Sequence, residues 1–374
     1  MPMRKVTLGE VAREHKEVCR EDRSSYPIVG LEHLTPEDVN LTAWSEDAEN
    51  TFTKMFRKGN VLFGRRRAYL RKAAQAPFDG ICSGDITVIE AIPGKIEPEL
   101  LPFVIQNDQL FDFAVEKSAG SLSPRVKWEH LKNYTFNLPE LAEQKKLADL
   151  LWAMDAAKQA YQRLLQKTDE LVKSRFSEMF GRMPRNEKHW TVVTIRDVVT
   201  EVRYGSSRPA VENGQYPYLR MNNITYSGEL DLSEIKRIDV PDNELSKCTV
   251  RRGDVLFNRT NSKELVGKTC VYNRDEMMVL AGFVIRVRLD HEKMLPEFLS
   301  AFLNTDFSKQ MLLNMCKTAI GQANINAQEL QNISVFLPPL QLQKDFVAIK
   351  QQLDKSKVIC NKIHKMVEFS QFRV

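Results

Sequence analysis

One nine-residue stretch occurs twice in the chain and indicates how it is organised. Its first copy is Arg57-Lys58-Gly59-Asn60-Val61-Leu62-Phe63-Gly64-Arg65, and its second is Arg251-Arg252-Gly253-Asp254-Val255-Leu256-Phe257-Asn258-Arg259. In each copy a basic turn around a glycine precedes a short apolar strand, and an arginine follows the strand. The repeat predicts that the chain holds two copies of one domain.

Other landmarks recur in the same order around this stretch. Residues 6–11 (VTLGEV) return as 193–198 (VTIRDV), Tyr26-Pro27 returns as Tyr216-Pro217, and Leu138-Pro139 with Gln144 returns as Leu337-Pro338 with Gln343. The period is far longer than the roughly 20 to 50 residues of a solenoid repeat, so it indicates a tandem duplication of whole domains.

Length and composition set the class of protein. The 374 residues correspond to about two to three domains. With 43% hydrophobic and 28% charged residues, the composition excludes a disordered or collagen-like chain. No apolar run approaches the roughly 18 residues that cross a bilayer, and the N-terminus lacks the apolar region of a signal peptide. We therefore predict a cytoplasmic protein without membrane contact, whose six scattered cysteines stay reduced.

Each copy begins with a segment that mixes strands and short helices. Residues 85–89 and 282–288 have the β-branched, alternating composition of strands, and residues 102–115 and 296–315 have helical spacing. The overall class is therefore α+β. We expect two tandem α/β globular domains, over residues 1–138 and 183–337.

Each copy ends in a long helix, a central one over residues 139–182 and a distal one over 338–374. The first heptad position holds Leu147, Met154, Tyr161 and Thr168 in one helix and Phe346, Leu353, Cys360 and Val367 in the other; the second holds Leu150, Ala157, Leu164 and Leu171, and Ile349, Ser356, Ile363 and Ser370. We predict an antiparallel coiled coil with a pseudo-two-fold axis between the copies. The alternative is that each helix packs on its own globule.

Positive charge gathers around the repeated stretch. Residues 54–78 hold eight basic residues and no acidic one, and residues 247–274 hold seven basic residues against two acidic ones. A single charge run is usually a solvated surface. Two runs at matching places favour a polyanion partner, and double-stranded DNA fits best because two globules on a rigid spacer can contact one duplex twice.

The motifs of common DNA enzymes are missing from the sequence. The tetrapeptide Asn/Asp-Pro-Pro-aromatic of DNA methyltransferases and the phosphate-binding loop of nucleotide-driven motors do not occur, and the six histidines lie far apart. We therefore predict no catalytic residue and no metal site. A nuclease or methyltransferase, the enzymatic alternative, would show activity as the purified chain alone.

These motifs resemble, over nearly the whole chain, the specificity (S) subunits of type I restriction-modification systems. The resemblance rests on residues 59–63 and 253–257, on residues 320–326 (IGQANIN) leading to Leu337-Pro338-Pro339-Leu340 with Gln343, and on a weaker counterpart, residues 119–124 (AGSLSP), leading to Leu138-Pro139 with Gln144. The first copy departs from the family pattern, which favours aspartate at Asn60 and a second proline at Glu140.

The resemblance implies two target recognition domains and two spacer helices that form the coiled coil. Such a subunit reads a bipartite, asymmetric DNA site, one half per domain, and is not itself an enzyme. Two methylation (M) subunits and restriction/translocase (R) subunits would join it, and S-adenosylmethionine, ATP and magnesium would belong to those partners, with no cofactor in this chain. A type IIB-like specificity subunit or a solitary DNA-binding regulator is the alternative.

We expect the DNA contacts to come from polar residues near the two basic strands and from a second loop in each copy. Glycine at Gly120 and Gly321 allows a close backbone approach in that loop. The predicted DNA-binding residues are Lys58, Arg65, Arg66, Arg67, Arg71, Ser121 and Arg125 in the first domain, and Arg252, Arg259, Asn261, Lys263, Gln322 and Asn324 in the second.

Overall fold

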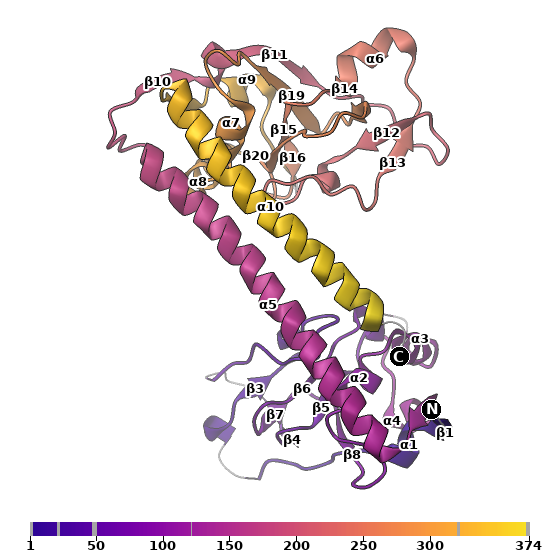
Figure 1. The fold of residues 1–374 in the computed structure, drawn as a ribbon. Coiled ribbons are helices and arrows are strands. Elements are labelled where there is room, and N and C mark those ends of the chain that lie inside the picture. The colour runs from indigo at the N-terminus through magenta and orange to yellow at the C-terminus, as the bar shows by residue number, and fades with distance from the viewer. Residues whose placement is uncertain (1–2, 21–22, 47–50, 121, 320–321, 372–374) are drawn as a thin grey trace. The chain divides into compact units, whose positions relative to one another are not determined.

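The computed structural model describes residues 3–20, 23–46, 51–120, 122–319 and 322–371 (Figure 1). The chain divides into two compact units. The first runs from the N-terminus to Gln159 and takes in the end of the chain from Ser370, and the second is Ala160–Phe369. Helix α5 (Leu141–Phe180) crosses the boundary, so the two units share one continuous helix.

The first unit is built on a four-stranded antiparallel sheet in the order β2-β8-β5-β6. A second sheet has the order β3-β7-β4 with β3 parallel to β7, and β1 pairs with β9. Its strands are β1 (Met3–Thr7), β2 (Ala12–Glu14), β3 (Ile28–Val29), β4 (Lys54–Phe56), β5 (Val61–Gly64), β6 (Ala73–Gln75), β7 (Gly80–Cys82), β8 (Ile86–Ala91) and β9 (Thr135–Pro139). Its short helices are α1 (Leu8–Val11), α2 (Leu101–Ile105), α3 (Asp108–Glu116) and α4 (Trp128–Leu131).

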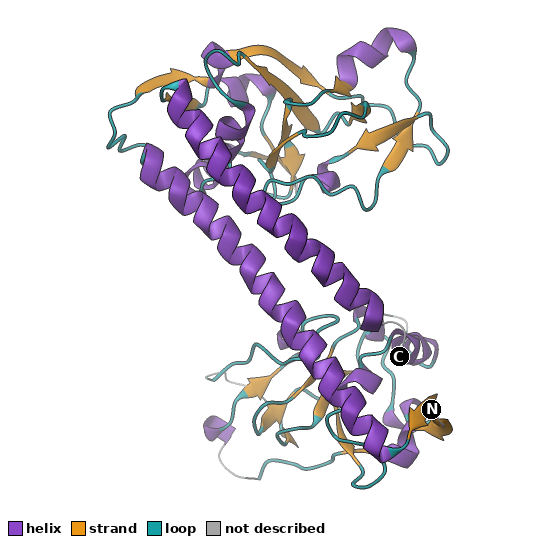
Figure 2. Ribbon diagram, in the orientation of Figure 1, coloured by secondary structure: helices purple, strands orange, loops and turns teal. Residues whose placement is uncertain are grey.

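The second unit repeats this plan. The sheet β11-β19-β15-β17 corresponds to β2-β8-β5-β6, and within β13-β12-β18-β14 strand β12 is again parallel to β18. Its strands are β10 (Thr191–Thr194), β11 (Val199–Tyr204), β12 (Tyr216–Leu219), β13 (Lys236–Ile238), β14 (Thr249–Val250), β15 (Val255–Asn258), β16 (Thr260–Asn261), β17 (Thr269–Val271), β18 (Met278–Leu280), β19 (Val284–Leu289), β20 (Lys317–Ala319), β21 (Gln322–Asn324) and β22 (Ser334–Leu337). Its helices are α6 (Asp242–Cys248), α7 (Pro296–Leu303), α8 (Asp306–Met315), α9 (Ala327–Gln331) and α10 (Leu340–Gln371). Figure 2 shows the mixture of strands and short helices in each unit that the sequence predicted.

The repeated turn before β5 and β15 has a structural role. In the turn before β5, the Asn60 side chain accepts a hydrogen bond from the Arg57 backbone N–H (2.8 Å), and in the turn before β15 Asp254 accepts the matching bond from Arg251 (2.8 Å). Asp254 also binds the Arg288 guanidinium (2.8 Å). The first unit has a glutamate, Glu90, at the position of Arg288, so a neutral asparagine suits this turn there.

The repeated glutamine is a structural residue as well. Gln144 is buried, and its amide accepts from the Glu97 backbone N–H (2.8 Å) and donates to the Pro139 carbonyl (2.8 Å). Gln343 does the same with the Leu295 N–H (2.9 Å) and the Pro338 carbonyl (2.9 Å). Each glutamine thus ties the start of a long helix to the loop before a short helix.

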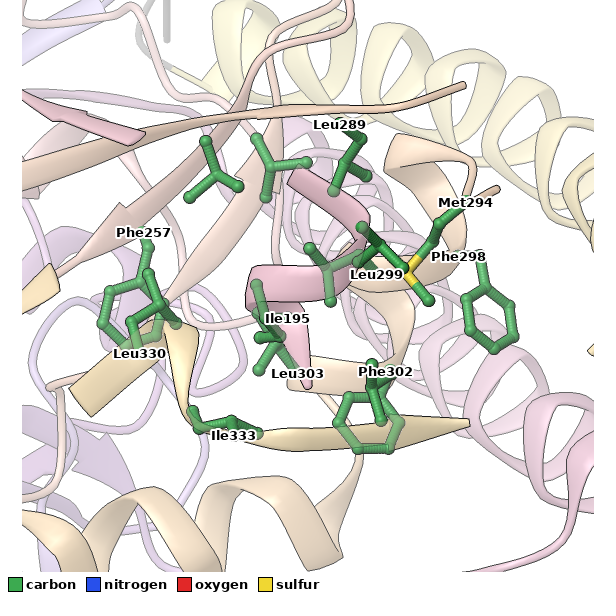
Figure 3. Close-up of a cluster of buried hydrophobic side chains, with 14 of the residues drawn as sticks. Ile195, Phe257, Leu289, Met294, Phe298, Leu299, Phe302, Leu303, Leu330 and Ile333 are labelled. Carbon is green, nitrogen blue, oxygen red and sulfur yellow. The ribbon is translucent and has the colours of Figure 1, made fainter. Parts of the chain in front are cut away.

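In the second unit, the long helices run antiparallel. Phe176 of α5 lies against Phe346 of α10 with ring centroids 5.3 Å apart, and further along, Asp169 forms an ion pair with Lys357. The partner number rises as the α5 number falls, which defines an antiparallel pair. The helices also pack on globular cores. Ala148 and Leu151 of α5 lie in the core of the first unit, and Phe346 of α10 lies in the core of the second, so each helix packs on its own globule as well as on its partner helix. Phe176 and Phe180 of α5 also pack on Phe298 of the second globule. Figure 3 shows part of this core, including Phe298 and Phe302 of α7.

The predicted heptad register of α5 was wrong at its second position. Leu150, Leu164 and Leu171 are 55%, 49% and 43% exposed. One residue later, Leu151 is buried in the core of the first unit and Val172 packs against the core of the second. Adjacent leucines at 150–151 and 164–165 make both registers possible in the sequence, and only packing distinguishes them.

The two expected short helices are each interrupted. Asn107 begins α3 as its N-cap, accepting from the Gln109 N–H (2.9 Å), and Thr305 begins α8 in the same way from the Ser308 N–H (3.2 Å). Residues 102–115 and 296–315 therefore each hold two helices. An N-cap inside an apolar periodic segment was the overlooked signal.

Candidate nucleic-acid interface

In the first unit, two loops meet at the end of β5. The backbone N–H of Arg65 donates to the Asp85 carbonyl (3.0 Å), and the N–H of Val126 donates to the Arg65 carbonyl (3.0 Å). Arg66 forms a β-bridge with Arg125. These bonds join the residues after β5 to the loop before α4, so the structure brings together Arg65, Arg66, Arg67 and Arg125.

The carboxylate of Asp85 holds two of these arginines. It accepts from Arg125 Nε (2.7 Å) and Nη2 (3.4 Å), and from Arg66 Nη1 (3.2 Å). The Ser123 hydroxyl accepts from Arg66 Nε and Nη2 (3.2 and 3.0 Å). Hydrogen bonds from Arg125 and then Arg66 hold the pKa of Asp85 below its usual range. The two arginine side chains keep 37% and 41% of their surface exposed, so they are fixed in orientation and still open to a ligand.

The neighbouring arginines differ in their surroundings. Arg67 is exposed and has a left-handed backbone (φ 55°), with its N–H bound to the Pro124 carbonyl (2.8 Å). The Nε of Arg65 is buried without a hydrogen-bond partner in the described structure. Its guanidinium therefore has donor capacity that the described part of the unit does not use.

Two predicted residues of the first unit lie apart from this cluster. Arg71 is surrounded by carboxylates, with Asp108 at 2.5 Å, Asp112 at 3.5 Å and Glu37 at 4.0 Å, so its charge is already compensated. Lys58 is exposed in the turn that precedes β5, at the opposite end of the strand from Arg65. Ser121 lies outside the described residues.

The second unit forms the same backbone frame. The N–H of Arg259 donates to the Phe283 carbonyl (3.0 Å), and the N–H of Ile325 donates to the Arg259 carbonyl (2.9 Å). Strand β16 pairs with β21 so that Thr260 lies opposite Asn324. The structure thus brings together Arg259, Asn261 and Asn324 near the exposed Lys263.

The side chains on this second frame are different. The Arg259 guanidinium lies over the Tyr204 ring at 4.9 Å, its Nη1 donates to the Gly282 carbonyl (3.4 Å), and its Nε is buried without a partner in the described structure. The position of Asp85 is taken by Phe283, which is 54% exposed. The Thr260 hydroxyl donates to Asn324 Oδ1 (2.9 Å).

The remaining predicted residues of the second unit are less informative. Arg252 lies in the turn before β15 and forms a two-point ion pair with Asp275 (2.7 and 3.0 Å), at the strand end opposite Arg259. Gln322 lies on β21, and Gly321 lies outside the described residues. The Asn261 side chain accepts from the Ser262 N–H (2.9 Å), which shapes the turn toward Lys263.

Sequence reasoning missed four residues at these sites, namely Asp85, Ser123, Tyr204 and Phe283. The available signal was the alignment of Ser83-Gly84-Asp85 with Ala281-Gly282-Phe283, which places an acidic residue and an aromatic one at the same point. Tyr204 lies more than fifty residues before Arg259 and carries no motif. Its contact depends on the pairing of β11 with β19.

The chemistry of both clusters is that of hydrogen-bond donors and positive charge. Guanidinium, amide and hydroxyl groups contact phosphates and base edges. Within the described ranges, no group of three or more His, Cys, Asp or Glu residues is arranged to hold a metal ion. No helix in the described part of the chain is long and apolar enough to cross a membrane.

Curated relatives share part of this chain. It is 27% identical over 255 residues to the type I restriction enzyme EcoKI specificity subunit of Escherichia coli (strain K12), covering 63% of this chain and 54% of that protein. It is 26% identical over 191 residues to the putative type I restriction enzyme MjaX specificity subunit of Methanocaldococcus jannaschii, covering 50% and 43%. The chain therefore spans about half the length of the curated relatives it matches.

A solved structure and a family model cover almost the whole chain. The crystal structure of the type I restriction-modification system S subunit from M. genitalium matches 99% of this chain and 94% of its own, with a TM-score of 0.59 and 13% identity, a likeness that concerns the fold alone. The model of the type I restriction modification DNA specificity domain matches residues 3–168 and again 187–368. With two tandem copies that together cover most of its length, the chain belongs to the type I restriction modification DNA specificity domain family, as its repeated motifs predicted.

Proposed function

We propose that this chain is the DNA sequence-specificity subunit of a type I restriction-modification complex. Each unit reads one half of a bipartite, asymmetric double-stranded site through its pair of loops. The observation that carries the proposal is the repeated backbone frame around Arg65 and Arg259, which presents donor-rich side chains twice in one chain. Such side chains fix register on phosphates and discriminate base edges.

In this proposal the chain supplies recognition, and partner subunits supply the chemistry. Two methylation subunits bind the helical region, and restriction/translocase subunits join them. S-adenosylmethionine, ATP and magnesium are bound by those partners. The exposed leucines of α5, Leu150, Leu164 and Leu171, support this arrangement, because they follow one helix face and offer apolar contacts to a partner.

The test is co-expression of the full chain with its methylation subunit, followed by mapping of methylated adenines in the host genome. We expect a split motif that disappears when this chain is omitted. Methylation that persists without the chain would contradict the proposal. Co-purification then separates the alternatives, since a type IIB-like subunit would bring a fused cleavage and methylation enzyme, and a solitary regulator would bind DNA without methylation subunits.

A further inference from the structure

The two units place different hydrogen-bonding side chains, an arginine and an asparagine, at one equivalent position. Arg66 follows Arg65 in the first unit, and Thr260 follows Arg259 in the second. Arg125 lies opposite Arg66, and Asn324 lies opposite Thr260. The frame bonds of Arg65 and Arg259 fix this equivalence, because they join matching residues of the two loops. Arginine and asparagine at such a position recognise different bases.

Arg125 is held so that one edge of its guanidinium stays available. Asp85 accepts from Nε and Nη2, and Nη1 has no acceptor among the described residues. Nη2 has a second N–H, which lies on the same edge of the guanidinium as Nη1. A planar guanidinium fixed along its Nε edge can therefore present Nη1 and Nη2 in parallel. Guanine offers two acceptors, O6 and N7, side by side in the major groove, which matches that fork.

Asn324 is held in a different way. The Thr260 hydroxyl donates to Oδ1 and fixes the orientation of the amide, while no described group accepts from Nδ2. The amide then offers one donor and one remaining acceptor lone pair on the same side. Adenine offers the complementary pair, an N7 acceptor and an N6 donor.

We propose that the half-site read by the first unit contains a G·C pair contacted by Arg125, with Asp85 as its positioning residue, and that the half-site read by the second unit contains an A·T pair contacted by Asn324. This inference rests on the proposed function and deepens it by naming a base in each half-site.

The test uses the full chain in complex with its methylation subunits and a DNA library in which both half-sites are randomised. Sequencing of methylated products gives the base preference at every position. For Arg125→Ala we expect the guanine preference at one pair of one half-site to fall about 10- to 100-fold, the discrimination that a two-point contact provides. For Asn324→Ala we expect the same loss for adenine at one pair of the other half-site.

Further variants separate base reading from folding. Arg125→Lys keeps the charge without the fork, so it should keep overall DNA affinity and lose guanine preference. Asp85→Asn should weaken the same preference, and Asp85→Glu, which retains a carboxylate, should recover part of it. Arg13→Ala removes an exposed arginine that pairs with Glu90 near the far end of β8, and Asn332→Ala removes an exposed asparagine; neither should change the motif.

Two results would overturn the inference while leaving the proposed function intact. One is a split motif that Arg125→Ala and Arg125→Lys leave unchanged, and the other is relaxation at a pair that is not G·C for Arg125 or not A·T for Asn324. Methylation that does not depend on this chain would remove the proposed function and the inference together.

Discussion

At the end of β5 the first unit places two arginines around the carboxylate of Asp85, whereas at the end of β15 the second unit places Arg259 over the Tyr204 ring and exposes Phe283. The backbone bonds beneath these side chains are the same in both units. Main-chain hydrogen bonds do not depend on side-chain identity. The side chains on this frame can therefore differ between the two units while the fold is kept.

The core positions show the opposite behaviour. Gln144 and Gln343 are the same residue, are buried alike and share two hydrogen bonds, because each satisfies a backbone N–H and a carbonyl at the start of a long helix. Gln343 donates in addition to the Lys293 carbonyl (3.1 Å). The amide oxygen of each glutamine must meet a backbone N–H while its amide nitrogen meets a carbonyl, so the position restricts which residue fits. The glutamine is repeated in sequence for a structural reason, although it lies beside the motifs that suggest function.

The largest effect is expected from breaking what the units share. Gln144→Leu and Gln343→Leu should each lower the free energy of unfolding by about 2 kcal/mol, since each removes the side-chain bond to a backbone N–H and to at least one carbonyl. Chemical denaturation measures the change. Gln351→Leu, at an exposed position of α10, is the matched control and should stay within about 0.5 kcal/mol. Equal stability of all three variants would show that the glutamines are not needed.

Lys309 marks a position at which the two units differ, a lysine in one and an apolar residue in the other. It occupies the fourth position after the N-cap of α8, where α3 has the buried Phe111. Burial lowers the pKa of Lys309 to about 7, and the charges of Lys173 and Lys268 add to this. The unfolded chain, with a lysine pKa of about 10.4, therefore binds more protons between pH 7 and 10, so stability rises with pH in that window.

Lys309→Met should remove this rise, on the order of 2 kcal/mol when the partial exposure of the side chain is discounted. Unfolding free energies measured from pH 6 to 10 give the slope. Lys355→Met, at an exposed site, should keep the slope of the unmodified chain. An unchanged slope in Lys309→Met would mean that another group titrates in this window.

Asp85 distinguishes the two units at acid pH, because the second unit has Phe283 at the equivalent position. Because its pKa is lowered in the folded state, its stabilisation is present above about pH 4, the ordinary carboxyl range, and is lost as pH falls through the folded value. Asp85→Asn should flatten that part of the stability curve, by about 1 kcal/mol or less because the arginines are partly solvated. Asp149→Asn, on an exposed face of α5, serves as the control, and a loss as large there as at Asp85 would contradict the assignment.

The smallest effect concerns the aromatic support of the second unit. Tyr204→Leu removes both the ring beneath Arg259 and the hydroxyl, and the ring contact should account for about 0.5 to 1 kcal/mol of the lost stability. Tyr204→Phe keeps the ring and loses only the hydrogen bond that the hydroxyl accepts from the Ala327 N–H (2.9 Å). A double-mutant cycle with Arg259→Ala isolates the contribution of the ring contact. A coupling energy of zero would show that this contact does not stabilise the protein.

Much of the fold could be predicted from local pattern. The Val-Leu-Phe strands, the glycine turns before them and the long helices after Pro139 and Pro338 are all encoded by neighbours in sequence. The sequence did not distinguish the buried face of α5 from the neighbouring exposed one, because Leu150 and Leu151 are both apolar. Of the predicted site residues, Arg66 and Arg125 proved to lie together, while Arg71 and Arg252 proved to be engaged by nearby carboxylates.

The duplication, the order of strand and helix within each copy, and the family could all be predicted from the sequence, because each depends on residue types at short range and on their recurrence. Which arginine side chains are held in place by neighbouring groups became visible in the tertiary structure alone. Asp85 meets Arg125 across 40 residues, and Tyr204 meets Arg259 through the pairing of neighbouring strands. Contacts of this kind form when strands come into register, so no local sequence pattern predicts them.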